Sequence, residues 1–404
     1  MEPFVFHHDC KTIFGRRALA HLGSECAARG NKVLLLYGRR HCQDSGLYRR
    51  VTETLTRAGV TWLALGGIRP NPTLAKVREG INLARKRKVQ AVVAVGGGSV
   101  MDSAKAVAAG ACVDHDVWLF FRGKKSIRRA LPVLCVPTVA GSGSECNHGM
   151  VLTNEADRQK IGIGNRHLLP AVALMDPELT CSVSWSQTLY GAVDTISHLL
   201  EIFGTAKPSP LQDRLATALV SSIMTSCEKL RMYPTDYPSR AELLWASALA
   251  LNGLTSAGRG RVGMPAHLLA HTLGGRYDLA HGALLSVTLP AWLRFIAERN
   301  PQRIAAWAKA IFTDDSTRYY RHQQDDERAR AASGIQALVA WLNRMGAPAS
   351  LGDLGIDAGP AQLAALVDHA LPQARLWRLH YSQADLRQML QNSGNAAKTA
   401  GAIN

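Results

Sequence analysis

The chain has 404 residues, more than a single hydrophobic core usually serves, so its length predicts two domains. Apolar residues make up 47% of the chain, an ordinary share for a globular protein. No apolar run approaches the roughly 20 residues that span a bilayer, which argues against an integral membrane protein. Lys and Arg number 47 against 31 Asp and Glu, so the formal net charge is +16.

The excess of basic residues raises the question of a nucleic-acid partner, because attraction to phosphate drives non-specific binding. The basic residues are spread along the chain in short clusters such as 85–88. No zinc-finger spacing, RNA-binding signature or long basic tail accompanies them. We therefore predict a basic enzyme surface and no nucleic-acid partner, with a preference for anionic cofactors or partners as the alternative.

The N-terminal segment and the cysteines bear on the cellular compartment. His8, Asp9 and Lys11 stand where a secretory signal would have an apolar run, so we expect cytoplasmic residence. The 8 cysteines are scattered and form no Cys-x-x-Cys pair. This pattern predicts reduced thiols rather than a disulfide framework or a cysteine metal site.

The first part of the chain alternates short apolar runs with amphipathic stretches. Strands are predicted at 32–37, 61–65, 89–95 and 131–136. Helices are predicted at 43–58, at 73–87 and after the glycines at 96–98, through about residue 109. Continuous apolar strands separated by helices indicate a parallel sheet that is covered on both faces.

The residue composition changes after about residue 180, where runs of β-branched residues disappear. Segments rich in Ala and Leu predict helices at 186–203, 209–230, 239–256, 264–274, 283–298 and 301–311. We therefore expect an α/β domain over 1–180 and an all-α domain over 181–404.

Two glycine-rich turns follow predicted strands. The first, Gly96 to Asp102, opens a helix, whose N-terminal N–H groups can bind phosphate. The second, Pro137 to Glu145, follows the next strand. Either turn alone is also compatible with a tight strand-to-helix connection. Together they predict a dinucleotide site at the C-terminal edge of the sheet, although neither matches the common G-x-G-x-x-G fingerprint.

Acidic and imidazole side chains recur at helical spacing in the second half. Asp194 and His198 stand four residues apart, as do His267 and His271, so each pair shares one helix face. His281 follows shortly after the second pair. One carboxylate with several imidazoles suits Fe²⁺ or Zn²⁺ better than Mg²⁺ or Ca²⁺. Spacing alone does not choose between His267 and His271 as a ligand.

With these motifs in this order, the chain resembles the iron-dependent (group III) alcohol dehydrogenase family. The resemblance rests on Gly96–Ser99 with Asp102 and Lys105, on Pro137–Glu145 and Asp176–Pro177, and on segments 194–201 and 267–282. It implies a Rossmann-like N-terminal α/β domain followed by an all-α C-terminal domain, in a dehydroquinate synthase-like architecture. It further implies a homodimer or a higher homo-oligomer.

The resemblance also implies roles for individual residues. The metal ligands would be Asp194, His198, His267 and His281. His271 would be the catalytic residue, as a proton relay or a residue on the nicotinamide side. The cofactor-binding residues would include Asn71, Gly97, Gly98, Ser99, Asp102, Thr138, Ser142, Asn147 and Lys160.

The end of the first cofactor-domain strand indicates which nucleotide binds. Many NAD-using relatives place an acid there to bind the adenosine ribose, whereas this chain has Gly38, followed by Arg39 and Arg40. Without a carboxylate to repel a 2′-phosphate, and with guanidinium groups able to bind one, NADP(H) is favoured and NAD(H) is the alternative. The chain looks most like the NADP(H)-preferring butanol dehydrogenase and aldehyde reductase branch.

The function expected is reversible hydride transfer between NADP(H) and a primary alcohol or aldehyde, with one divalent metal ion. The nearest alternative is another reductase of the superfamily, of the polyol, hydroxy acid or maleylacetate type. A sugar-phosphate cyclase would need a denser set of cations near the metal segments than Arg261 and Arg276 provide. A non-catalytic basic binding protein is the remote alternative.

Overall fold

A computed structural model describes residues 1–39, 41–312 and 326–394. The chain forms two compact units: one comprises Phe6–Thr188 and Met232–Gly253, and the other comprises Met1–Val5, Leu189–Arg231 and the residues from Leu254 onward. Within the described ranges, no helix has the length and apolar content needed to cross a bilayer.

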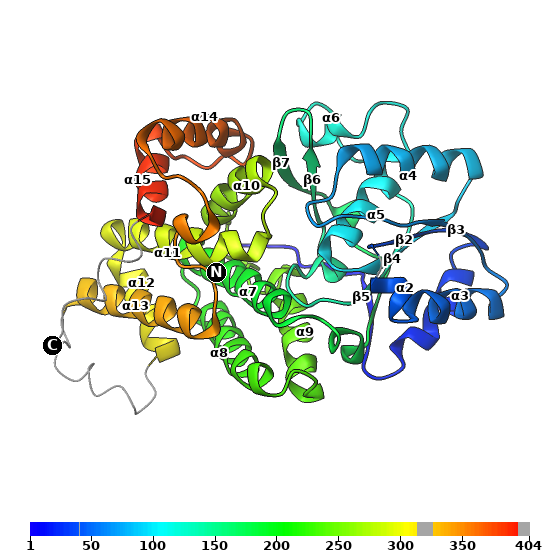
Figure 1. Ribbon diagram of the computed structural model, residues 1–404, viewed down its shortest axis with the longest axis horizontal. Helices are drawn as coiled ribbons and strands as arrows, with labels where there is room; N and C mark the ends of the chain where they lie inside the picture. The colour runs from blue at the N-terminus through cyan, green and yellow to red at the C-terminus, as the bar shows by residue number, and fades with distance from the viewer. Residues whose placement is uncertain (40, 313–325, 395–404) are drawn as a thin grey trace. The chain divides into compact units, whose positions relative to one another are not determined.

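The first unit is built on a parallel sheet of six strands in the order β1-β8-β5-β4-β2-β3 (Figure 1). The strands are β1 (Lys11–Phe14), β2 (Lys32–Tyr37), β3 (Thr61–Leu65), β4 (Ala91–Gly96), β5 (Val133–Pro137) and β8 (Val172–Met175). The four predicted strands are thus confirmed as β2 to β5. The prediction missed β1 and β8, which are only four residues long and lie together at one edge of the sheet.

Alternation along the central strands divides the core into two layers. In β2, Leu34 and Leu36 pack in one cluster, whereas Val33 and Leu35 pack in another on the opposite face. Helices α4 (Leu74–Arg87) and α5 (Gly98–Gly110) cover the first face, and α1 (Leu22–Ala27) and α3 (Leu47–Arg57) cover the second (Figure 1). Burial on both faces explains why these strands are continuously apolar.

The strand order places the two glycine turns at one edge of the sheet. Because β5, β4 and β2 are parallel neighbours, their C-terminal ends lie side by side, with Gly96 paired to Pro137 and Tyr37 paired to Val95. After leaving β3, at one margin of the sheet, the chain returns to place β4 on the other side of β2. Such a reversal is where ligands bind in open α/β sheets.

The rest of this unit consists of short helices, a hairpin and one returning helix. The elements are α2 (His41–Asp44), α6 (Trp118–Phe121), the antiparallel pair β6 (Gly149–Asn154) and β7 (Gln159–Gly164), and α9 (Tyr237–Leu251). Because α9 belongs to this unit, the two units do not separate at a single point of the chain. The domain boundary near residue 180 stays a prediction.

The second unit is helical. It contains most of α7 (Trp185–Thr205), together with α8 (Pro210–Met232), α10 (Pro265–Tyr277), α11 (His281–Arg299), α12 (Pro301–Phe312), α13 (Glu327–Met345), α14 (Pro360–Leu376) and α15 (Gln383–Gly394). Each helix predicted after residue 180 is present with bounds shifted by a few residues. The sequence analysis did not predict α13, α14 and α15.

Candidate functional site

Helix α7 carries three acidic or imidazole side chains on one face. Asp194, His198 and Glu201 lie at positions i, i+4 and i+7, which a period of 3.6 residues aligns along one side of the helix. All three are buried, and Glu201 is completely shielded from solvent. Charged groups are buried in this way only when they have partners, so this face of α7 needs partners from other helices.

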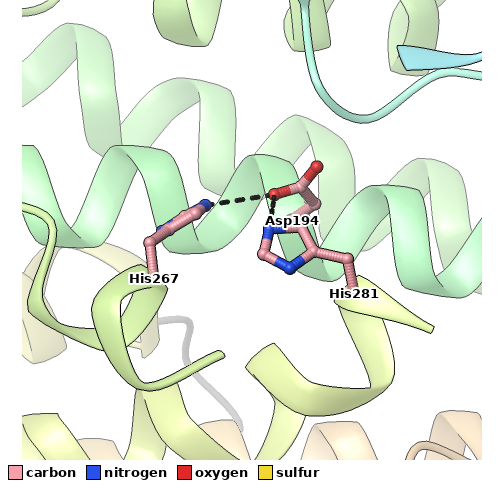
Figure 2. Close-up of side chains that lie close together, drawn as sticks. All are labelled: Asp194, His267 and His281. Carbon is pink, nitrogen blue, oxygen red and sulfur yellow. Dashed lines mark hydrogen bonds and ion pairs between the residues drawn. The ribbon is translucent and has the colours of Figure 1, made fainter. Parts of the chain in front are cut away.

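Those partners come from α10 and from the start of α11. His267 Nε2 lies 3.2 Å from Asp194 Oδ1, and His281 Nε2 lies 3.7 Å from the same oxygen. Figure 2 shows both imidazoles directed toward the Asp194 carboxylate. His198 Nε2 approaches the same atom at 3.5 Å, and its ring stacks on that of His267 with the centroids 4.6 Å apart. Three imidazoles therefore converge on one carboxylate oxygen.

The spacing of these donor atoms fits a small divalent cation. With bonds of about 2.0–2.1 Å, the ligands of a tetrahedral site stand about 3.4 Å apart. The three nitrogen-to-oxygen distances, from 3.2 to 3.7 Å, lie around this value. Asp194, His267 and His281 also offer one ligand atom each within 4.8 Å of one another. The donor set of one carboxylate and three imidazoles thus suits Zn²⁺ or Fe²⁺.

The electrostatics of the cluster also favour a cation. Burial lowers the pKa of His198 to about 4, so its ring is neutral near pH 7 and its lone pair is available. For His267 burial also acts to lower the pKa, but Glu201 and Asp194 outweigh it and raise the pKa to about 9. Two buried carboxylates that stabilise an imidazolium would equally stabilise a metal ion.

Glu201 holds His267 in place. Its Oε2 accepts a hydrogen bond from His267 Nδ1, and its Oε1 accepts from the backbone N–H groups of His267, at 3.2 Å, and Ala266, at 2.6 Å. The ring is thereby oriented with Nε2 toward Asp194. Glu201 ends the motif segment 194–201, but no role was predicted for it. Its position three residues after His198, on the same helix face, is the sequence signal that could have identified it as a support for a ligand.

His271 lies beside this cluster but outside the group of converging ligand atoms. Its ring centroid is 5.2 Å from that of His281 and 6.2 Å from that of His267. Its Nδ1 faces Gln373 Nε2 at 3.3 Å, and Trp377 packs on the ring with the centroids 5.3 Å apart. The sequence analysis missed both α14 contacts, because it expected no helix there.

In the other unit, the first glycine turn leads from β4 into α5. Gly97 caps the helix, and α5 begins at Gly98. A Cβ at Gly98 would come within 2.4 Å of Ser142 Oγ, so the two glycine turns pack tightly against each other here. A Cβ at Gly97 would meet only Val139, at 3.6 Å, so that backbone is accessible to an approaching ligand. Ser99 follows in the first turn of the helix.

The second turn is tied to the first through the backbone and a buried lysine. The N–H of Thr138 donates to Gly96 O at 3.0 Å. The fully buried Lys105 donates to Ser144 Oγ at 2.9 Å and to both the backbone and the side-chain oxygens of Asn147, at 2.9 and 3.1 Å. Asn147 Nδ2 in turn donates to Ser142 O at 3.1 Å. The edge of the sheet therefore carries one connected pair of turns.

Three more of the predicted cofactor residues, Asp102, Lys160 and Asn71, have partners within the chain. Both oxygens of the buried Asp102 accept bonds from the chain, from Ser144 Oγ at 2.7 Å and from Val151 N at 3.0 Å. Lys160 Nζ on β7 donates to Asn71 Oδ1 at 2.7 Å, and both residues are buried. Their predicted contacts with a cofactor stay predictions.

The segment expected to distinguish NADP(H) from NAD(H) follows β2. Gly38 accepts a hydrogen bond from the N–H of Gly67 at 3.0 Å, and Arg39 is exposed. Both stand at the sheet edge that carries the glycine turns, next to the end of β4. Arg40 lies outside the described residues.

A parallel sheet with paired glycine turns, followed in the chain by a helical unit with a buried Asp and His cluster, defines a dehydroquinate synthase-like oxidoreductase. Comparison with known families agrees. The chain belongs to the iron-containing alcohol dehydrogenase family, whose model matches residues 10–177, while the model of that family's C-terminal region matches residues 188–393. The family and the fold class expected from the sequence are both confirmed, and the protein is an NAD(P)-dependent oxidoreductase of this family.

Individual relatives cover nearly the whole chain. A probable NADH-dependent butanol dehydrogenase of Bacillus subtilis is 35% identical over 92% of this chain and 94% of its own length. The NADPH-dependent aldehyde reductase YqhD of Escherichia coli is 32% identical over 92% of this chain and 95% of its own. The crystal structure of NADH-dependent butanol dehydrogenase A from Thermotoga maritima superposes with a TM-score of 0.92, at 36% identity, covering 98% and 99% of the two chains.

Proposed function

We propose that the chain catalyses reversible hydride transfer between NADP(H) and a primary alcohol or aldehyde at a divalent metal centre. The metal ligands in this proposal are Asp194, His198, His267 and His281. The observation that carries it is the approach of three imidazole nitrogens to the single atom Asp194 Oδ1. The named relatives, which include butanol dehydrogenases and an aldehyde reductase, support the substrate class.

Reduction of an aldehyde requires a hydride at the carbonyl carbon and a proton at the oxygen. Fe²⁺ or Zn²⁺ held by Asp194 and the three imidazoles would supply Lewis-acid polarisation of the substrate oxygen, and reduced nicotinamide would supply the hydride. Glu201 keeps Nε2 of His267 directed at the ligand position. His271, next to the cluster, passes the proton between the substrate oxygen and solvent.

The glycine turns hold the pyrophosphate in this proposal. The first N–H groups of a helix point out of its N-terminus and favour an anion there, and Gly97, which caps α5, lets the phosphates approach that end closely. Thr138 and Ser142, on the second turn, line the same edge of the sheet. The tight packing of Ser142 against Gly98 supports one binding site made of both turns.

The substitution Gly97→Ala tests the proposed pyrophosphate site and should have little effect on the fold. The backbone there has a φ of −84°, and the new methyl group would make only ordinary contact with Val139. We expect the KM for both NADPH and NADH to rise about tenfold, because the methyl occupies the path of the phosphates. Thermal unfolding checks that the fold is intact. Gly352→Ala, in a short turn of the helical unit, is the control and should leave both KM values unchanged.

The choice of NADP(H) rests on the end of β2. This edge offers an exposed guanidinium at Arg39 and no carboxylate at Gly38. A guanidinium binds a 2′-phosphate with charge-assisted hydrogen bonds, whereas NAD selection usually uses an acid at this position. The relatives' names include both NADH and NADPH, so the choice rests on these residues.

Arg39→Ala is expected to raise the KM for NADPH about tenfold and to change the KM for NADH less than twofold. Loss of one partly exposed charge-assisted contact to the 2′-phosphate accounts for that size. Arg57→Ala removes an equal charge from the end of α3, before β3 begins at the opposite edge of the sheet, and is the control. Equal effects on both cofactors would contradict the proposed 2′-phosphate contact.

The activity itself is tested by oxidation of NADPH and NADH over a panel of aldehydes. The protein is stripped of metal and reconstituted separately with Fe²⁺ and Zn²⁺. We expect metal-dependent reduction of simple aldehydes, faster with NADPH. Turnover confined to hydroxy acid, polyol or maleylacetate-type substrates would favour the alternative reductases instead.

A further inference from the structure

A pocket of about 700 Å³ lies in the first unit, beside the segment that follows α5 and the loop between α6 and β5. Lys124, Lys125, Arg128 and Arg129 line it, and we call them the pocket cations. None of the described residues that line the pocket carries a carboxylate. Ligand pockets of this size are mostly apolar and contain few charged groups, so four cations in one pocket indicate an anionic ligand.

The pocket lies at the edge of the sheet opposite the two glycine turns. Helix α5 begins beside the first glycine turn, at Gly98, and ends at Gly110, so its two ends lie at opposite edges. Cys112, which lines the pocket, follows the far end of the helix. The loop after α6 leads into the start of β5, where Leu131 N donates to Ala108 O at 3.1 Å. The pocket is therefore separate from the proposed cofactor site.

The pocket cations have no acidic partner in the part of the chain that the structure describes. All four are exposed, and Arg129 Nη2 donates a long hydrogen bond of 3.4 Å to Cys112 O. Two carboxylates precede the loop. Asp116 is held by Arg78, whose Nε and Nη2 donate to it at 2.8 and 3.1 Å, and Asp114 is exposed and does not line the pocket. The positive charge of the pocket is thus available to a ligand.

The backbone that carries the pocket cations is held by bonds to the rest of the unit. The N–H groups of Lys124 and Lys125 both donate to Leu119 O, at 2.9 and 3.2 Å. Ile127, which stands between the two pairs of cations in the chain, is buried, and its carbonyl accepts from Asn165 Nδ2 at 3.1 Å. A fixed backbone lowers the entropy cost of binding, because only the side chains remain to be ordered.

A second group of basic side chains lies at the same edge of the sheet. Residues 85–88 stand at the end of α4, and all four are exposed Lys or Arg. Arg85 Nη2 donates to Gly110 O at 2.8 Å, which places this group beside the segment that leads to Cys112. Charges act over about 10 Å in 0.1 M salt, so neighbouring basic groups add to the attraction for an anion. Residues 85–88, for which the sequence predicted only a basic enzyme surface, thus increase the positive potential near the pocket.

We propose that this pocket binds a small anion that carries a chain of phosphates, such as inorganic tripolyphosphate or the triphosphate of a nucleotide. Guanidinium groups bind phosphate oxygens in pairs, and ammonium groups add point charges that adapt to a flexible chain. A pocket of bounded volume favours a compact ligand over an extended nucleic acid. The inference goes beyond the proposed function, since no step of the hydride transfer involves this edge of the sheet.

Alkylation of Cys112 reports whether the pocket is occupied, because this partly exposed residue lines it. The zinc-loaded full chain is treated with iodoacetamide in excess Mg²⁺, which keeps the phosphates from removing the zinc, and modified peptides are quantified by mass spectrometry. With tripolyphosphate at about ten times its dissociation constant, we expect the reaction to slow about tenfold, because only the free pocket reacts. Cys181, which is also partly exposed but does not line the pocket, is the internal control and should react at an unchanged rate.

ATP distinguishes the two sources of the phosphate chain. Protection of Cys112 by ATP and by tripolyphosphate at similar concentrations would show that the phosphates alone are recognised. Protection by ATP at much lower concentrations would show that the ligand is a nucleotide bound through its phosphates.

Lys124→Gln combined with Arg128→Gln removes two pocket cations and keeps side chains of similar length. We expect the tripolyphosphate concentration for half-maximal protection to rise about tenfold, as the loss of two exposed charge-assisted contacts would give. Arg49→Gln combined with Arg57→Gln removes the same charge from exposed positions on α3 and is the matched control. Thermal unfolding checks that both variants fold.

The proposal is overturned if neither phosphate compound protects Cys112, or if the pocket variant and its control require the same concentration as the parent. Protection by an RNA oligonucleotide alone would also overturn it, because the surface would then serve a nucleic acid. None of these readouts uses turnover. Absence of aldehyde reduction would therefore refute the proposed function and leave this test interpretable.

Discussion

His267→Ala should remove the metal ion and the activity together. Among the proposed ligands, His267 is held at both ring nitrogens, which Asp194 and Glu201 approach. Without it, two buried carboxylates remain with fewer nitrogen donors, and the set of one carboxylate and three imidazoles is incomplete. We expect bound metal after dialysis to fall below about a tenth of the parent content, and turnover to fall roughly a thousandfold. Elemental analysis and the NADPH assay measure the two losses on one preparation.

His271→Ala is the matched comparison for His267→Ala, because it separates loss of a metal ligand from loss of the proton relay. His271 stands four residues farther along the same helix and is buried to a similar degree, but it lies outside the group of converging ligand atoms. We expect it to keep its metal and to lose about a hundredfold in kcat, through loss of the proton relay. If His267→Ala retained metal and normal turnover, the ligand assignment would be wrong. If His271→Ala lost metal, the roles of the two residues would have to be exchanged.

The sheet was predictable from the sequence where its strands are buried on both faces. Helices cover both faces of the sheet, so runs such as 91–95 are apolar at every position and are recognisable as buried strands. The edge strand β1 and its neighbour β8 gave no such signal, since each is four residues long and Lys11 begins β1 with a polar side chain. Their pairing depends on contacts between residues about 160 positions apart, which local pattern cannot reveal.

The candidate site was predictable in its chemistry and less so in its supports. The spacing of Asp194 and His198 indicates a shared helix face, and the structure brings His267 and His281 to the same carboxylate. Spacing within one helix could not rank His267 above His271; the tertiary fold separates them by directing only one toward Asp194. The burial of Gln373 could not be predicted from the sequence, because it depends on how α14 packs against other helices.

Glu201→Gln should weaken metal binding without removing a ligand. Glu201 acts as an acceptor four times: Oε1 takes the backbone N–H groups of Ala266 and His267, and Oε2 takes His267 Nδ1 and the hydroxyl of Ser197 at 3.0 Å. A glutamine has only one oxygen, so its amide nitrogen must face either the backbone donors or the imidazole donor. The ring then loses both its orientation and the negative charge behind it. We expect the dissociation constant for Zn²⁺ to rise 10- to 100-fold, the range of about one to two orders of magnitude typical for such supports.

A competition titration with a zinc-binding dye measures that constant directly, without reference to turnover. Glu145→Gln is the matched control, because Glu145 is also a buried glutamate but lies in the second glycine turn of the other unit. Burial raises the pKa of Glu145 to about 7, so the neutral amide there replaces a carboxyl that is already partly protonated near neutral pH. Its zinc affinity should equal that of the parent. Equal affinities in all three proteins would show that Glu201 only braces the fold, because a structural brace would affect unfolding and leave the orientation of His267 unchanged.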